Sequence, residues 1–127
     1  MRPGGWTKVD RASFEEAVRQ KMKEVEARAS LAPLSSKLRL VPFSKALRIL
    51  PRWLEESLPF LMPRGPIYGF EAFAFTPEGE VPLGAVVIVG IYDEGSGEGV
   101  IVDDEWIDAQ LVEVEELLRE ALGSGAP

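Results

Sequence analysis

One hairpin decides the fold of this chain: residues 67–92 read IYGFEAFAFTPEGEVPLGAVVIVGIY. In the first half, large apolar side chains occupy both alternating faces, as expected for a β-strand that is covered on both sides. Residues 76–79, Thr-Pro-Glu-Gly, match a tight turn with proline at its second position. Residues 81–92 are rich in β-branched side chains and predict the returning strand. The two strands are therefore antiparallel neighbours.

A third strand follows the hairpin. A glycine-rich acidic turn over residues 94–99 leads into the apolar residues 100–102. A connection this short joins antiparallel neighbours, since a parallel pair needs a crossover of a dozen residues or more. The sequence therefore predicts an antiparallel sheet of three or more strands.

Two amphipathic helices flank this sheet along the chain. Apolar residues recur three or four positions apart over residues 13–30, and we expect Ser13 to start this helix in a capping box with Glu16. The same spacing predicts a second helix over residues 104–122, which Gly123 ends.

The predicted fold class is α+β, with the antiparallel sheet packed against the N- and C-terminal helices. A chain of 127 residues is long enough to form one domain with its own core. We expect residues 1–127 to form that single domain, with flexible ends at 1–8 and 123–127.

The middle of the chain, residues 31–66, carries a proline every few positions. It predicts short helices over residues 45–50, which Ser44 caps, and over 52–58. The loop 60–66 holds three large apolar side chains and three interruptions by proline or glycine after them. Whether this loop is buried or forms an exposed interface stays open.

The composition excludes several kinds of chemistry. The chain has no Cys and no His, 21 acidic residues against 14 basic ones, and a net charge of −7. Cysteine or histidine nucleophiles, a Ser-His-Asp triad, Cys/His zinc sites and thiol redox chemistry are therefore ruled out. Ten Pro, no Asn and two Gln are typical of heat-tolerant proteins, and equally of GC-rich coding sequences.

Targeting signals are absent from the sequence as it stands. Its first residues contain no apolar run of the kind that signal peptides require. The longest apolar stretch, residues 85–92, is far shorter than the about 20 residues that cross a bilayer as a helix. We therefore expect a cytoplasmic protein with no membrane contact.

Charge is divided along the chain. Residues 1–64 hold 13 basic and 7 acidic side chains, whereas residues 65–127 hold one basic residue, Arg119, and 14 acidic ones. Either the two halves pack on each other within one domain, or the acidic half faces a basic partner protein. A nucleic-acid contact through the basic segment 37–64 is a further alternative, which the overall acidity opposes. That contact would use Lys45, Arg48, Arg52 and Arg64.

Carboxylates are the remaining catalytic candidates. Glu71 is a lone charge within an apolar strand, and Asp93 and Asp103 lie on either side of the third strand. If the three converged at one end of the sheet, they could hold Mg²⁺ for a metal-dependent hydrolase or nuclease. The stretch 94–105 also matches a calcium loop in part, but Glu94 stands where Asp is required and a strand precedes it.

Because no catalytic motif is present, we expect a non-enzymatic protein–protein interaction or assembly module. It would be a regulatory subunit or a homo-oligomer that binds a basic partner surface through its acidic C-terminal half, without a cofactor or a metal. Trp, Arg and apolar loops dominate protein interfaces, and we expect Trp106 to be partly exposed. The candidate interface residues are Arg52, Trp53, Phe60, Leu61, Met62, Arg64 and Trp106.

Overall fold

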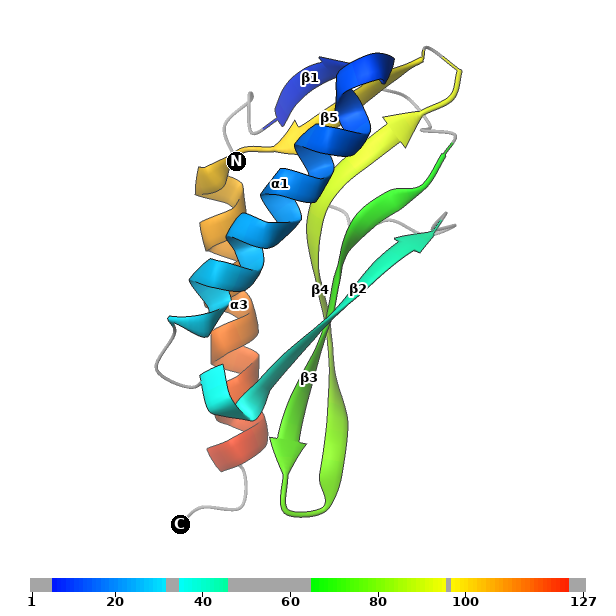
Figure 1. Ribbon diagram of the computed structural model, residues 1–127. Coiled ribbons are helices and arrows are strands. Elements are labelled where there is room, and N and C mark those ends of the chain that lie inside the picture. Colours follow the sequence, from blue (N-terminus) through cyan, green and yellow to red (C-terminus); the bar gives the residue numbers. More distant parts are fainter. Residues whose placement is uncertain (1–5, 32–34, 46–64, 96, 124–127) are drawn as a thin grey trace.

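The computed structural model describes residues 6–31, 35–45, 65–95 and 97–123 (Figure 1). Its fold is α+β, a five-stranded antiparallel sheet with an N-terminal and a C-terminal helix, which confirms the predicted class. The elements in chain order are β1 (Trp6–Asp10), α1 (Arg11–Ser30), the 3₁₀ turn η1 (Ser35–Lys37), β2 (Leu38–Lys45), β3 (Ile67–Thr76), β4 (Gly79–Asp93), β5 (Glu98–Val102) and α3 (Asp104–Gly123).

The strands lie in the order β1-β5-β4-β3-β2, and every neighbouring pair is antiparallel. The predicted hairpin is formed by β3 and β4, whose register runs from Ile67 opposite Ile91 to Thr76 opposite Gly79. The predicted third strand is β5, which pairs with residues 90–93 of β4. The hairpin and the strand after it are therefore confirmed.

Strand β1 lies where the sequence suggests a flexible segment. Residues 6–8 of the stretch 1–8 belong to this strand, which pairs with β5 over its whole length. Its stability comes from ladder bonds to a strand about 90 positions away, which local sequence does not reveal. Asp10 ends the strand and caps α1, because its carboxylate accepts a hydrogen bond from the Ser13 amide at 2.9 Å. The predicted cap at Ser13 is therefore wrong.

Strand β2 lies inside the proline-rich segment, where the sequence predicts no strand. Proline has no N–H and is tolerated at the edge of a sheet. Because β2 is the last strand of the sheet, Pro42 can sit within it. Lys45, the first residue of one predicted short helix, ends this strand. The rest of the predicted helices 45–50 and 52–58, and most of the loop 60–66, lie outside the described residues.

Both helices lie on one side of the sheet, next to each other (Figure 1). Glycines let α1 approach the strands closely: a Cβ at Gly99 would lie 2.0 Å from the Phe14 ring, and one at Gly90 would lie 3.1 Å from Val18. The predicted apolar stripe of α3 faces the core, where Ile107, Val114 and Leu118 are buried. No helix in the described part of the chain is long and apolar enough to cross a membrane.

Candidate partner-binding surface

The two oppositely charged halves of the chain pair with each other in the folded domain. Basic residues of the first half contact acidic residues of the second half from the strands and from α1. The pairs are Lys8–Glu98 at 3.9 Å, Lys21–Asp104 at 2.6 Å, Arg28–Asp104 at 3.2 Å, Arg28–Asp108 at 2.9 Å and Arg39–Glu80 at 2.6 Å. Much of the basic charge that the structure describes is therefore used within the domain.

Three of these ion pairs join α1 to the start of α3. Lys21 donates a hydrogen bond to the Asp104 carboxylate, and Arg28 lies beside the same group. These two cations, with Lys21 as the larger influence, lower the pKa of Asp104 below its ordinary value of 3.8. Asp104 also lies in the first turn of α3, where the helix dipole favours a negative charge.

Farther along α3 lie carboxylates that, unlike Asp104, are not held by cations of α1. Glu113, Glu116 and Glu120 are exposed, and none of them has an ion pair within the described residues. Arg119, the basic residue of this region, is bonded to Glu115 at 2.8 Å. Carboxylates are disfavoured near a helix C-terminus, where the dipole is negative. Glu120, in the last turn, therefore carries its charge at a small cost in stability, while Glu113 and Glu116 present negative charge to the solvent farther from that end.

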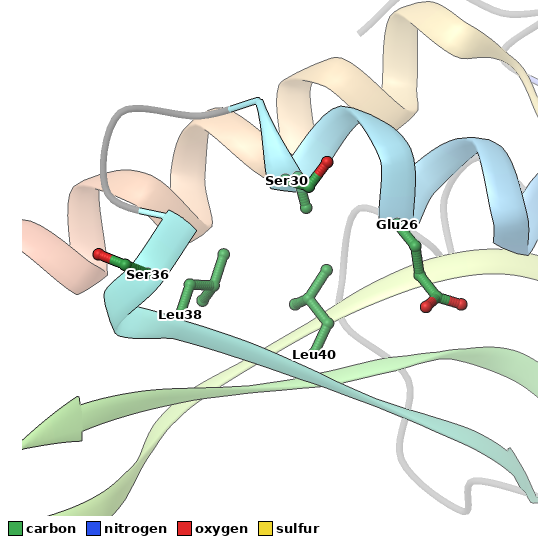
Figure 2. Close-up of a pocket in the computed structure, with 6 residues that line it drawn as sticks. Glu26, Ser30, Ser36, Leu38 and Leu40 are labelled. Atoms are coloured by element: carbon green, nitrogen blue, oxygen red, sulfur yellow. The ribbon is translucent and has the colours of Figure 1, made fainter.

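A hollow of about 270 Å³ separates the end of α1 from β2 (Figure 2). Leu38 and Leu40 project from β2 toward the helix and form its apolar floor, while the Glu26 side chain comes from α1 (Figure 2). Glu26 is exposed and has no ion pair in the described ranges. The remaining lining residues are Ala29, Ser30 and Ser36.

A second hollow, of about 380 Å³, lies between the end of α1, the start of β2 and α3. It shares Ala29 and Leu38 with the first hollow, so the two form one continuous surface. Two large apolar side chains stand open beside it: Leu31 is 85% exposed and Val112 is 56% exposed. We refer to Leu31, Leu38, Leu40, Leu111 and Val112 together as the α1–β2–α3 surface. Exposed apolar groups gathered around a hollow and rimmed by polar residues are typical of binding sites.

An aromatic cluster at the other end of α1 has a structural role. The Arg11 guanidinium donates a hydrogen bond to the Tyr92 hydroxyl at 2.5 Å, and this bond raises the pKa of Arg11. The Phe14 ring lies between Tyr68 and Tyr92, with centroids 5.5 Å and 5.2 Å away. These contacts attach the first turn of α1 to β3 and β4. A hollow of about 370 Å³ lies beside these residues, and Arg11 in its lining is already bonded to Tyr92.

Comparison with family models, curated proteins and solved structures finds no match for this chain. The function is therefore inferred from the chemistry of the described residues.

The three candidate catalytic carboxylates do not converge. Glu71 lies within β3, opposite Val86. Asp93 ends β4 and accepts a hydrogen bond from the Gly95 amide at 3.3 Å, while Asp103 accepts one from the Thr7 hydroxyl at 2.6 Å. Among the described residues, no three His, Cys, Asp or Glu side chains gather in a way that could hold a metal ion. The predicted carboxylate cluster is therefore wrong, because Glu71 lies within β3, Asp93 at the end of β4 and Asp103 just after β5.

The partial match to a calcium loop is a hairpin turn. Residues 94–97 connect β4 to β5, and the strand β5 occupies the positions that a calcium loop would fill. Calcium loops of that family need a helix on each side, and a strand precedes this one.

The predicted interface residues are largely outside the described part of the chain. Six of them fall outside the described residues: Arg52, Trp53, Phe60, Leu61, Met62 and Arg64. Arg48, which belongs to the alternative nucleic-acid contact, also falls outside. Trp106 is described and is only 5% exposed, within the core. The expected partial exposure of Trp106 is therefore wrong, because the side chain belongs to the hydrophobic core instead of facing the solvent.

The apolar residues of the α1–β2–α3 surface were not predicted from the sequence. One of them did carry a signal: Val112 lies off the apolar stripe of the last helix, beside Glu113 and close to Glu115. An apolar residue on the polar face of an amphipathic helix has no core to join. Leu31 gave no comparable signal, because its exposure depends on where α1 ends.

Proposed function

We propose that this chain is a protein-binding module that takes up an apolar and basic segment of another protein on the α1–β2–α3 surface. The observation that carries the proposal is the exposure of Leu31 and Val112 beside two connected hollows. Burying such side chains gains about 25 cal/mol for each Å² of apolar surface removed from water. Carboxylates around the surface add selectivity for a basic partner.

The distribution of charge supports a basic partner. Cations of the N-terminal half are paired with Asp104, Asp108 and other acids, whereas Glu26 at the first hollow has no ion pair among the described residues. Carboxylates at the rim of a contact increase the rate of encounter with a basic protein and disfavour acidic ones. A regulatory or assembly role fits a surface of this modest size, which suits transient binding.

The experiment compares the loss of partner protein when an exposed apolar residue is replaced inside the α1–β2–α3 surface and when one is replaced outside it. The tagged wild-type chain and its Val112→Ser and Leu31→Ser variants are each used to recover binding proteins from an extract of the source cells. Val81→Ser is the matched control, because Val81 is 40% exposed at the far end of β4. We expect the Val112 and Leu31 variants to lose a protein that the wild-type chain and the Val81 variant retain.

Equal capture by all four chains would contradict the proposed function. Each variant is first checked by thermal melting, and none should lose much stability, since exposed positions tolerate substitution to within about 0.5 kcal/mol. Sedimentation of the wild-type chain alone reports whether the recovered partner is a second copy of this protein.

A further inference from the structure

The outer edge of β2 carries backbone groups that no strand in the described part of the chain satisfies. This strand is the last of the sheet and pairs with β3 alone. In an antiparallel ladder, the N–H and C=O of one residue point to the same neighbour, and those of the next residue point the other way. Pro42 has no N–H to give to β3, so its position faces outward. Leu40 and Leu38, two and four positions earlier, face outward with it.

The other side of the sheet supports this assignment. Pro42 lies opposite Phe70, which must then direct its backbone groups to β4, where it pairs with Val87. The next residue, Ile88, must therefore point away from β3. It does so: its N–H donates to Gln110 Oε1 at 2.7 Å, and its C=O accepts from Gln110 Nε2 at 2.9 Å.

No described side chain bonds to the outward backbone groups of Leu38 and Leu40 as Gln110 bonds to those of Ile88. Within residues 6–31, 35–45, 65–95 and 97–123, their outward N–H and C=O groups have no hydrogen-bond partner. The hollow of about 270 Å³ opens beside the same two residues, and Glu26 reaches toward it from α1 (Figure 2). Backbone donors and acceptors, an apolar hollow and a carboxylate therefore lie together.

We propose that an extended segment of the partner protein adds to the sheet as a further strand along Leu38–Leu40. This inference rests on the proposed function and specifies how the partner is held. Main-chain hydrogen bonds to β2 provide affinity, and alternate side chains provide specificity. One apolar side chain of the segment enters the hollow over Leu38 and Leu40. A Lys or Arg two positions away, on the same face of the segment, pairs with Glu26.

A second copy of β2 is a poorer occupant of this edge. Antiparallel pairing of two copies would place Pro42 of each in the shared ladder, and each copy would lose a donor there. A net charge of −7 also opposes the association of two copies. The same charge favours a basic segment from another protein.

The test uses the full ¹⁵N-labelled chain and a short end-blocked peptide, the valine–lysine peptide, in which valine and lysine take turns on one face and threonine occupies every second position. One control peptide has the same side chains but carries N-methyl groups on alternate residues, which removes the backbone donors of one edge. A second control has glutamate in place of each lysine. We expect the valine–lysine peptide to slow amide exchange at Leu38 and Leu40, and the N-methylated peptide to bind at least about tenfold more weakly.

A pair of protein variants tests the role of Glu26. Glu26→Gln should weaken binding of the valine–lysine peptide by about two- to fivefold, as expected for an exposed charge pair. Glu24→Gln removes the same charge from the same helix, where Glu24 lies 3.9 Å from Lys21, and should leave peptide binding unchanged.

Several results would overturn strand addition. These are equal binding of the N-methylated peptide, no binding of the valine–lysine peptide, or spectral changes confined to Leu31 and Val112. In the last case protein binding stands and only its mode is wrong. Dimers that protect Leu38 and Leu40 without peptide would make a second copy the occupant. Failure of the proposed function itself is seen separately, as equal capture by the Val112 and Val81 variants.

Discussion

Residues 79–89 of β4 and the edge strand β2 both lack a neighbouring strand on one side in the described structure, and the protein treats these two stretches differently. Residues 79–89 of β4 extend beyond β5, while β2 is the end of the sheet. At β4, α3 lies alongside and Gln110 bonds to both backbone groups of Ile88. At β2, Pro42 removes one donor and the groups at Leu38 and Leu40 stay open.

The difference shows that an edge can be satisfied without a strand. A primary amide has one acceptor and two donors, so the Gln110 side chain reproduces the pair of bonds that a neighbouring residue would make. The covered edge is thereby protected from pairing with another chain, whereas the open edge is suited to it. Four predictions test this comparison.

The largest expected effect comes from proline at two adjacent positions of β2. Val41 faces β3 in the ladder, so Val41→Pro removes a ladder bond and should lower the free energy of unfolding by about 3 kcal/mol. Leu40→Pro removes an outward N–H only and should cost roughly 1 kcal/mol through backbone fit. Urea denaturation of both variants measures the difference. Equal losses would show that the outward assignment of β2 is wrong.

The amide that covers β4 should be nearly as sensitive. Gln110→Leu leaves the N–H and C=O of Ile88 buried without partners and should cost about 3 kcal/mol of unfolding free energy. Gln20 provides a matched control, since it is the other glutamine of the chain and bonds to Glu16 on the exposed face of α1 at 3.0 Å. Gln20→Leu should change stability by less than about 0.5 kcal/mol. Similar losses in the two variants would contradict the proposed role of Gln110.

Amide exchange compares the two edges within one sample. We expect the Ile88 amide, bonded to Gln110 and buried, to exchange near the rate set by global unfolding. The outward amides of Leu38 and Leu40 should exchange at least about a hundredfold faster, because no bond has to open. Protection at Leu38 and Leu40 in the free protein would mean that the β2 edge is already occupied.

The sequence contains enough to predict the centre of this fold but not its edges. The hairpin of β3 and β4 depends on alternation and on a local turn, and α3 depends on a regular apolar stripe, so both can be read from neighbouring residues. Strands β1 and β2 depend on pairing with distant partners. The pattern WTKVD carries little apolar signal, and Pro42 argues against a strand until its place at the sheet edge is known.

The candidate site was harder to predict, for a related reason. The α1–β2–α3 surface joins Leu31, Leu38 and Val112 from three elements, and their proximity follows from the packing of α1 against α3. Composition did indicate that the charged halves would contact each other or a partner. It could not indicate which acids pair internally, such as Asp104, and which remain open, such as Glu113.

The smallest expected effect concerns the ion pairs that hold α3 beside α1. Asp104→Asn removes a carboxylate whose folded pKa is lowered by Lys21 and Arg28. A lowered pKa stabilises the fold above the ordinary value of 3.8, and this contribution is lost as the pH falls through the folded pKa. Because the Asp104 side chain is half exposed, solvent screens the pairs, and the loss at neutral pH should be about 0.5 kcal/mol.

The two ends of α3 should respond to charge removal with opposite signs. Glu120→Gln removes a carboxylate that has no ion pair in the described ranges and lies near the helix C-terminus, so it should leave stability unchanged or raise it slightly. Urea denaturation at neutral pH and below pH 3.8 compares both variants with the wild-type chain. If Asp104→Asn cost the same at both pH values, the ion pairs to α1 would not be what Asp104 contributes. The alignment of α3 along β4 would then depend on Gln110 and the apolar stripe alone.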